Sequence, residues 1–281
     1  MRKEITLGFS PCPNDTYIFD ALVNGKMDTK GYCFKPILAD VEELNNWAAQ
    51  GKLDVTKISY NALGHLTQNY SLLRSGSALG RGCGPLLISK EELVFNQEIL
   101  SDLEIAIPGN MTTANFLLMH ALPKAMKKKE FLFSEIEGIV NRGETSLGVI
   151  IHENRFTYKD NGLKLVVDLG AHWEKTTKMP IPLGGIVANN SLSANEQREI
   201  SQLILESIEI ANKNPSDSFN YRKEHSAEMD EAVMRSHIDL YVNKFSIDLG
   251  EEGEKAVNFF INRGVEKGIF PKNSKLNIVK Y

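Results

Sequence analysis

The sequence contains few cysteines, and they form no recognisable set. Only Cys12, Cys33 and Cys83 occur among 281 residues. An odd number at wide, unequal spacing fits neither a disulfide framework nor a zinc motif. Because disulfides belong to oxidising compartments, this usage is typical of a reducing cytoplasm. We therefore expect a cytoplasmic protein without a metal site.

Long apolar runs are also lacking. No stretch reaches the roughly 18–20 apolar residues that span a bilayer. The first nine residues pass from charged side chains directly into a strand pattern, without the apolar segment of about 7–15 residues that a secretory signal has. We expect neither export nor a membrane partner.

The chain has no excess of basic charge. Lys and Arg total 32 against 36 Asp and Glu, which gives a formal net charge of −4. This balance gives no reason to expect a nucleic-acid partner. The dense basic run 124–129 is interrupted by Ala125 and Met126, so we interpret it as a solvated helix end or loop. The length fits two α/β lobes better than one.

Strand and helix patterns alternate through the first part of the chain. The predicted strands are 4–10, 32–38 and 53–58. Helices that begin near Asn14 and Asp40 separate them, and we expect Asn14 or Asp15 to cap the first helix. This order indicates a parallel sheet with crossover helices. The glycine-rich segment 72–89 then suits a crossing between lobes.

A second alternating series leads into a helical tail. Its predicted strands are 104–108, 146–151, 163–169 and 181–188. From Ser193 the pattern is helical, and Ser193 with Glu196 forms a capping box. Because the tail must pack against earlier segments, we predict a discontinuous first lobe of residues 1–88 and 187–281, with residues 89–186 as the second lobe.

Three loops follow predicted strands, where open parallel sheets bind ligands. The first, residues 10–16, reads Ser-Pro-Cys-Pro-Asn-Asp-Thr. Ser10 and Asn14 can orient a ligand there, or the loop can serve only as a rigid helix start. Cys12 has no base beside it in the sequence, so a nucleophilic role is not favoured and its role stays open.

The second and third loops offer groups that bind anions. Lys57 and Ser59 fall where a strand gives way to a short helix. Lys57 is either a snorkelling surface lysine or presents its ammonium to one anion, together with the Ser59 hydroxyl and backbone N–H groups. Thr112 and Thr113 open a helix after Gly109, and the unpaired N–H groups of a helix start favour a carboxylate or a phosphate. Threonine is also a common helix-start residue, so this pattern alone is weak.

His152 differs from the other five histidines, which lie in or beside amphipathic helical patterns. It follows an apolar strand directly and so stands at the carboxyl edge of a sheet. An imidazole there can accept a proton at neutral pH. His152 is therefore the candidate catalytic base. No pair of histidines has the spacing of a metal-binding helix.

Taken together, these segments resemble the 1,4-dihydroxy-6-naphthoate synthase family of the futalosine route to menaquinone. The similarity covers nearly the whole chain, and the Ser-Pro-Cys-Pro-Asn-Asp-Thr run is its most specific part. The chorismate-dehydrating sibling family shares the fold but lacks this run. One departure is Tyr17, where the family often has Phe; both fill an aromatic slot.

The resemblance implies an α/β, two-lobed fold like that of the periplasmic solute-binding proteins (type II), with a hinged cleft between the lobes. It implies a lyase that converts cyclic dehypoxanthine futalosine to 1,4-dihydroxy-6-naphthoate. His152 would be the proton acceptor, and Lys57, Ile58, Ser59, Thr112 and Thr113 would line the substrate site. Because cleavage restores an aromatic ring, no cofactor is expected.

Several alternatives stay open. The chain could be a lyase like the chorismate-dehydrating sibling, or a protein of the same fold that binds a small carboxylated molecule without converting it. Our hypothesis is that a substrate carboxylate binds at Thr112 and Thr113. The C-terminal helices could bury their apolar residues in the core or in a homodimer, and the sequence does not decide between the two.

Overall fold

The computed structural model describes residues 3–152, 154–225 and 230–280. The chain divides into two compact units, the first of residues 1–80 and 182–281 and the second of residues 81–181. The first crossing therefore lies within the predicted glycine-rich segment. The predicted lobe bounds lie several residues further along the chain, inside strands that pair within the two sheets, and sheet pairing rather than composition sets the division.

The first unit is built on a six-stranded sheet in the order β2-β1-β3-β11-β4, with β5 paired to β11. Its strands are β1 (Lys3–Phe9), β2 (Tyr32–Leu38), β3 (Val55–Ser59), β4 (Tyr70–Leu72), β5 (Ala78–Gly80) and β11 (Ile181–Asn189). β1 is parallel to both β2 and β3, whereas β11 is antiparallel to β3 and β4. The parallel half follows the predicted strand–helix alternation.

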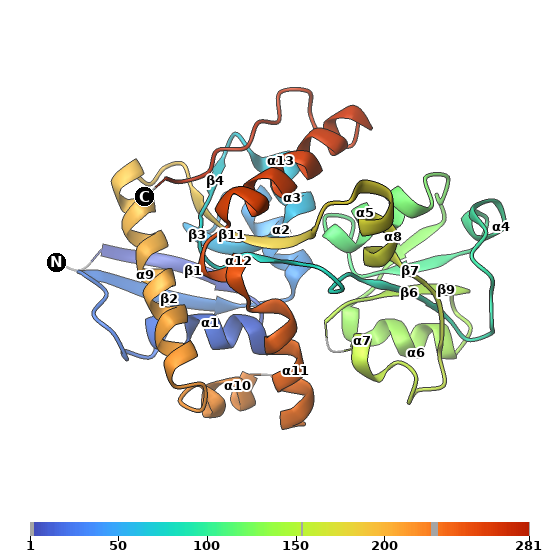
Figure 1. The fold of residues 1–281 in the computed structure, drawn as a ribbon, viewed down its shortest axis with the longest axis horizontal. Helices are drawn as coiled ribbons and strands as arrows, with labels where there is room; N and C mark the ends of the chain where they lie inside the picture. Colours follow the sequence, from blue (N-terminus) through green and yellow to red (C-terminus); the bar gives the residue numbers. More distant parts are fainter. Residues whose placement is uncertain (1–2, 153, 226–229, 281) are drawn as a thin grey trace. The chain divides into compact units, whose positions relative to one another are not determined.

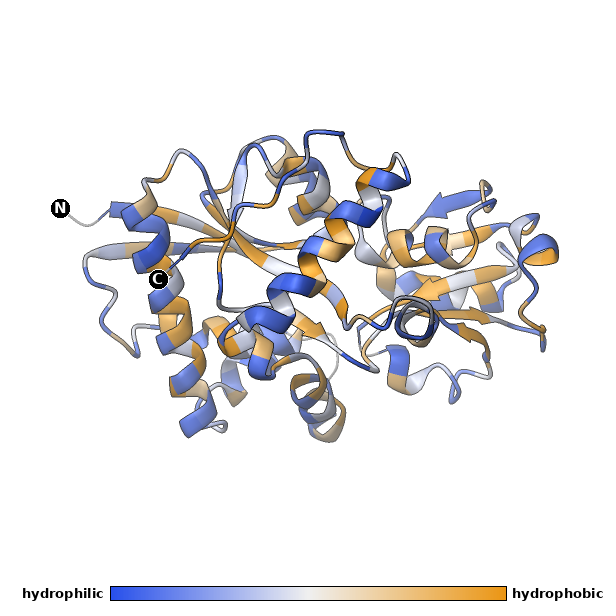
Figure 2. Cartoon of the chain, turned by 45° about the horizontal axis from the view of Figure 1, so that its top comes forward, coloured by the Kyte–Doolittle hydropathy of each residue, from blue (hydrophilic) through white to orange (hydrophobic). Residues whose placement is uncertain are grey.

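Helices accompany this sheet and are labelled in Figure 1. They are α1 (Pro13–Val23), α2 (Val41–Ala49), α3 (Tyr60–Leu66), α9 (Ala194–Lys213), α10 (Phe219–His225), α11 (Glu231–Tyr241), α12 (Lys244–Ile247) and α13 (Gly250–Glu266). The predicted capping box is confirmed at the start of α9, where Ser193 and Glu196 exchange hydrogen bonds. Figure 2 shows that the helices carry both hydrophobic and hydrophilic residues, as expected for helices that bury one side.

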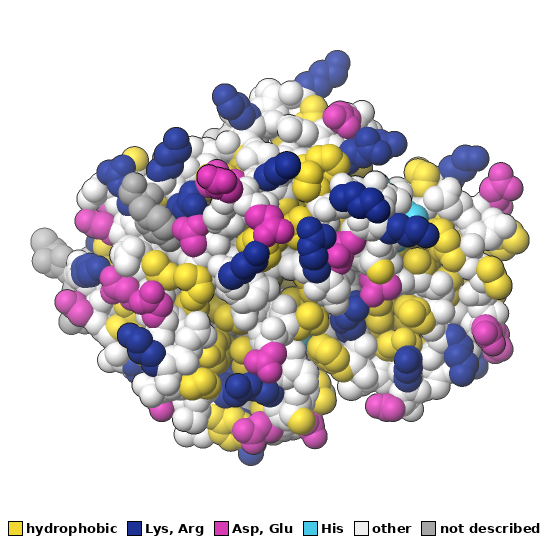
Figure 3. Space-filling model, viewed as in Figure 1, with side chains coloured by type: hydrophobic (Ala, Val, Ile, Leu, Met, Phe, Trp, Pro, Cys, Tyr) yellow, Lys and Arg dark blue, Asp and Glu magenta, His cyan; other side chains and the backbone are white. Residues whose placement is uncertain are grey.

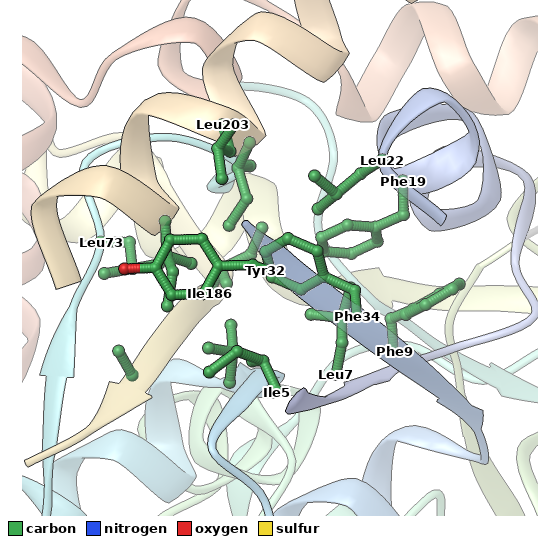
Figure 4. Close-up of a cluster of buried hydrophobic side chains, with 14 of the residues drawn as sticks. Ile5, Leu7, Phe9, Phe19, Leu22, Tyr32, Phe34, Leu73, Ile186 and Leu203 are labelled. Carbon is green, nitrogen blue, oxygen red and sulfur yellow. The ribbon is translucent and has the colours of Figure 1, made fainter. Parts of the chain in front are cut away.

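The core of the first unit forms between the sheet, α1 and α9. Alternate residues of β1 are fully buried, as the period of two predicts. They pack against apolar residues of both helices (Figure 4). The labelled members are Ile5, Leu7, Phe9, Phe19, Leu22, Tyr32, Phe34, Leu73, Ile186 and Leu203. Burial of one such side chain stabilises the fold by about 1.5–3 kcal/mol.

The second unit contains a five-stranded sheet in the order β10-β6-β9-β7-β8. Its strands are β6 (Leu86–Ser89), β7 (Ile105–Ile107), β8 (Lys128–Glu130), β9 (Leu147–Ile150) and β10 (Lys164–Asp168). Its helices are α4 (Gln97–Ser101), α5 (Thr113–Ala121), η1 (Phe133–Glu135), α6 (Ile136–Asn141), α7 (Asn154–Thr157) and α8 (Leu169–Thr177). A separate apolar cluster, which includes Ile88, Ala106 and Ile150, forms its core.

Charged side chains of both signs are interspersed over the face of the molecule that Figure 3 shows. This mixture agrees with the small formal net charge. Among the described residues, no helix combines the length and the apolar character that crossing a membrane requires.

Candidate active site

Two of the predicted loops leave the sheet of the first unit at the same edge. β1 and β3 are parallel neighbours, with Leu7 opposite Val55, so their carboxyl ends lie side by side. Ser10 follows β1, and Ser59 is the last residue of β3. β11 closes the other side of β3, where Gly184 lies opposite Ser59. The loop 10–16 and the end of β3 are therefore neighbours.

A buried ion pair joins these two segments. Lys57 Nζ lies 3.1 Å from Asp15 Oδ1, and the two side chains are 8% and 4% exposed. The same ammonium donates to the carbonyl oxygen of Gly76 over 2.8 Å. Because a buried charge is costly unless it is paired and hydrogen-bonded, these contacts hold Lys57 in one position. The alternative of a snorkelling surface lysine is wrong.

Ser10 and Asn14 are bound to the same carboxylate. Ser10 donates its hydroxyl to Asp15 Oδ2 over 2.8 Å and its backbone N–H over 3.2 Å. Asn14 donates its side-chain amide to Asp15 Oδ1 over 2.7 Å. All of these groups are buried. Asp15 therefore connects three of the predicted site residues, although the sequence pointed to it only as a helix cap.

The predicted cap at Asn14 or Asp15 is wrong. α1 begins at Pro13, with Cys12 as the N-cap residue and no side-chain capping bond. Proline is well suited to the first helical position because its fixed φ matches the helix and it needs no hydrogen-bond acceptor. The helix thus starts earlier than expected, and the Asp15 carboxylate turns back toward the loop instead of capping the helix.

Ser59 and Ile58 lie beside this cluster with different roles. Asn45 of α2 accepts the Ser59 N–H over 2.9 Å and donates to its hydroxyl oxygen over 3.2 Å. The side chain of Ile58 is 1% exposed and lies in the core. Ile58 is therefore available to a ligand only through its backbone, next to Gly184 of β11.

The other predicted site residues lie at one edge of the second sheet. β7 and β9 are parallel neighbours, with Ile105 opposite Leu147. The loop before α5 follows β7, and His152 stands two residues beyond the end of β9. The carboxyl ends of parallel strands meet at one edge, so this unit brings the imidazole and the start of α5 to the same edge.

The backbone of His152 is left-handed, with φ of 55°. This conformation is uncommon for residues other than glycine and is concentrated at functional sites. The ring is half-buried and lies edge-on to Phe133, with ring centroids 4.9 Å apart. Arg155, three residues later, donates to the carbonyl of Gly84 and to Asp168 Oδ2, the latter over 2.8 Å. These bonds anchor α7 to the rest of the second unit.

Thr112 and Thr113 open α5 as predicted. Thr112 is the N-cap: its hydroxyl accepts the N–H of Asn115 over 3.3 Å and donates to the carbonyl of Gly109 over 2.8 Å. Gly109 has φ of 143°, which residues with a side chain rarely adopt. The loop is therefore tightly constrained, and it begins a helix of nine residues whose amino end favours negative charge.

Sequence reasoning missed a lysine near this helix start. Lys128 donates to Asn115 Oδ1 over 2.9 Å, and Asn115 donates to the carbonyl of Asn110 over 2.8 Å. Burial lowers the pKa of Lys128. The run 124–129 is thus not merely a solvated loop, because it enters strand β8, where alternate side chains point to opposite faces. Only that strand assignment would have singled out Lys128.

The groups at the carboxyl edge of each sheet determine which chemistry that edge can support. The first unit presents a fixed ammonium, hydroxyls and amides, which are hydrogen-bonding groups for an oxygen-rich ligand. The second unit presents an imidazole and a helix start supported by a lysine, which suit proton transfer and carboxylate binding. Among the residues that the structure describes, no group of three or more His, Cys, Asp or Glu is arranged to hold a metal ion.

The fold is that of the periplasmic binding proteins. The alkanesulfonate-binding protein of Xanthomonas axonopodis pv. citri has a TM-score of 0.72 at 11% sequence identity, covering 95% of this chain and 94% of that one. The aliphatic sulphonate-binding protein of Escherichia coli has a TM-score of 0.68 at 9% identity, over 98% and 96% of the two chains. At such low identity the likeness shows the fold alone, and it confirms the predicted fold class.

The particular family follows from the sequence comparisons. A family model described as menaquinone biosynthesis matches residues 5–266, and the chain belongs to this family. The 1,4-dihydroxy-6-naphthoate synthase of Thermus thermophilus is 44% identical over 255 residues, 91% of this chain and 92% of that one. The enzyme of the same name from Streptomyces coelicolor is 38% identical over 95% of each chain. The predicted resemblance is confirmed.

Proposed function

We propose that this chain is a carbon–carbon lyase that converts cyclic dehypoxanthine futalosine to 1,4-dihydroxy-6-naphthoate, with His152 as the proton acceptor. The proposal is supported by the names of the two curated relatives, which extend over more than nine-tenths of the chain. The observation that carries the mechanism is the imidazole at the carboxyl edge of β9, beside the strand that leads into Thr112 and Thr113.

The chemistry asks little more than proton movement and positioning. Cleavage of the spiro-joined sugar fragment restores an aromatic ring, which drives the reaction without a change of redox state. His152 would take a proton and the carbon–carbon bond to the fragment would break. The electron pair of that bond would enter the ring, and the pair released by deprotonation would form a double bond in the departing fragment. One positioned base contributes about 10²–10⁴-fold in rate. For this reason the proposal includes no cofactor.

The substrate carries a carboxylate, and we assign it to the start of α5. The N–H groups of the first turn and the helix dipole favour an anion there. Lys128, bonded to Asn115 in the same turn, adds a positive charge nearby. Lys57, the Ile58 backbone and Ser59 would bind the oxygen-rich remainder of the substrate, together with Ser10 and Asn14. A location in the cytoplasm fits the three cysteines, which form no disulfide among the described residues.

Turnover of defined substrates tests this function. Purified protein is incubated separately with cyclic dehypoxanthine futalosine and with chorismate, and the products are followed by naphthoate absorbance and mass spectrometry. We expect 1,4-dihydroxy-6-naphthoate from the first substrate and no reaction with the second. Conversion of chorismate would identify the sibling dehydratase instead. Tight binding of the first substrate without any product would identify a binding protein.

A further inference from the structure

We propose that Asp15 is a positioning residue of this site, which acts on the substrate through the ammonium of Lys57. The inference rests on the proposed function, because it assigns a role to a side chain that holds the binding groups without touching the substrate itself. In this proposal, the positions of Lys57, Ser10 and Asn14 depend on Asp15.

The hydrogen bonds of Asp15 occupy both of its oxygens. Oδ2 accepts the backbone N–H and the hydroxyl of Ser10, at 3.2 and 2.8 Å. Oδ1 accepts the amide of Asn14 at 2.7 Å and the ammonium of Lys57 at 3.1 Å. An ionised carboxylate offers about four lone-pair sites. With four donors in place and 2% of the residue exposed, Asp15 has no acceptor site left for a ligand.

The groups that Asp15 holds keep capacity for a ligand. Lys57 has three N–H donors, of which Asp15 and the Gly76 carbonyl take two. The third has no partner among the described residues. Ser10 gives its proton to Asp15, so its oxygen can only accept a further hydrogen bond. Asp15 thereby sets which atoms of this loop donate to the substrate and which accept from it.

Another aspartate of α1 provides a matched comparison. Asp20 is also buried and pairs with a lysine, Lys26, at 2.6 Å. It belongs to the same helix, but its side-chain hydrogen bonds among the described residues are to Asn24 and Lys26, at the far end of that helix. If Asp15 served stability alone, replacing either aspartate would have the same kind of effect. The proposal predicts that only Asp15 alters substrate binding.

The experiment is a double-mutant cycle in the full-length protein with Asp15→Asn, Lys57→Gln and the double variant. Asparagine keeps an oxygen for Ser10 but presents an amide N–H₂ to the two donors of Oδ1, Asn14 and Lys57. Asn14 can turn its amide so that its oxygen accepts, whereas an ammonium has no acceptor, so the ion pair is the contact mainly lost. We expect Asp15→Asn to raise KM by roughly tenfold with kcat changed less than about threefold, as for loss of uniform binding. In the Lys57→Gln background the same change should alter KM by less than about twofold, because coupled residues are non-additive.

Controls separate this role from a structural one. Asp20→Asn should leave KM within about twofold, even if it lowers the melting temperature. Removing one partner of a buried pair can prevent folding, whereas the double variant leaves no lone charge. If Asp15→Asn does not fold, the double variant is therefore compared with Lys57→Gln alone, and equal KM values are expected.

Independent effects of the two substitutions, or a folded Asp15→Asn protein with unchanged KM, would overturn the inference. Binding of 1,4-dihydroxy-6-naphthoate, followed by fluorescence, is measured for the same variants. If the wild-type protein turns over the substrate but the two substitutions act independently on KM, only the role of Asp15 is contradicted. A wild-type protein that neither turns over the substrate nor binds the naphthoate contradicts the proposed function, and the inference fails with it.

Discussion

At the scale of single residues, the two edges use opposite devices to hold a functional group. Lys57 is fixed by electrostatics, because its buried ammonium must stay with Asp15 and the Gly76 carbonyl. His152 is instead oriented by its backbone, because a left-handed φ sets the direction in which its side chain leaves the chain.

The role of His152 as the base predicts a loss of turnover without a loss of binding. We expect His152→Ala to lower kcat by about 10²–10⁴-fold, because the proton then has no positioned acceptor. The affinity for the naphthoate should be largely kept. His120→Ala is the control, because that imidazole sits in the last turn of α5 and bonds Thr176 at 2.9 Å. Turnover of His152→Ala within about threefold of wild type would dismiss it as the base.

At the scale of elements, two helix starts have charged partners that the sequence pattern reveals only in part. α5 begins with a threonine cap, and a lysine from the neighbouring strand β8 bonds to its first turn. α9 begins with a capping box, and Lys3 of β1 reaches its glutamate. In both cases a residue distant in sequence completes the helix start, because the sheet brings its strand alongside.

Loss of the Lys128 charge should weaken carboxylate binding. We expect Lys128→Met to raise KM by about fivefold, since a charge near a helix start contributes on the order of 1 kcal/mol. Lys129→Met is the matched control, because Lys129 is exposed and pairs with Glu104 at 3.1 Å. Steady-state kinetics on both variants make the measurement. Equal KM values for the two variants would show that Lys128 is not part of the binding site.

The start of α9 predicts a contribution to stability that depends on pH. Hydrogen bonds from Lys3 and then Ser193 lower the pKa of Glu196 from 4.5 to about 2. Because the pKa in the folded state lies below the unfolded value, the carboxylate stabilises the fold above pH 4.5, and this contribution is lost as the pH falls toward 2. Solvent screening at this partly exposed site limits it to about 1 kcal/mol or less.

Urea unfolding of Glu196→Gln and wild type at about pH 6 and pH 3 measures this effect. The two proteins should differ in free energy of unfolding at the higher pH, and the difference should shrink at the lower one. Glu209→Gln, an exposed glutamate of the same helix, should match wild type at both. A difference between Glu196→Gln and wild type that is independent of pH would contradict the assignment.

At the scale of the whole molecule, the two units differ in how the chain builds them. All five strands of the second sheet come from the continuous segment 81–181, together with the apolar cluster beneath them. The first sheet needs β11, which lies between β3 and β4 and arrives only after the second unit. The segment 1–80 alone therefore lacks the strand that joins β4 to the rest.

This difference predicts which fragments can fold. The isolated segment 81–181 should unfold cooperatively on heating, because its sheet and core are complete. The isolated segment 1–80 should not, because its sheet is interrupted and the apolar face that α9 covers is exposed. Circular dichroism melts of the two peptides compare them. A cooperative transition of 1–80 would show that β11 and α9 are dispensable for the first unit.

The sequence by itself determined the strand–helix alternation, the α9 capping box, the loops proposed to carry the site, and the family. These are local or pattern properties: a period of two, a cap three residues before a glutamate, and short motifs such as residues 10–16. One sequence is enough to reveal these properties, because residues close together along the chain determine them.

Only the tertiary structure decided that Asp15 binds Lys57, that the Ile58 side chain lies in the core, and that Lys128 bonds to the first turn of α5. Each depends on contacts between residues far apart in sequence, 42 positions for Asp15 and Lys57. Whether a charged side chain points to water or inward depends on which strands pair, and its burial cost then selects its partner. Such pairing is a property of the packed sheet, so no local pattern could reveal it.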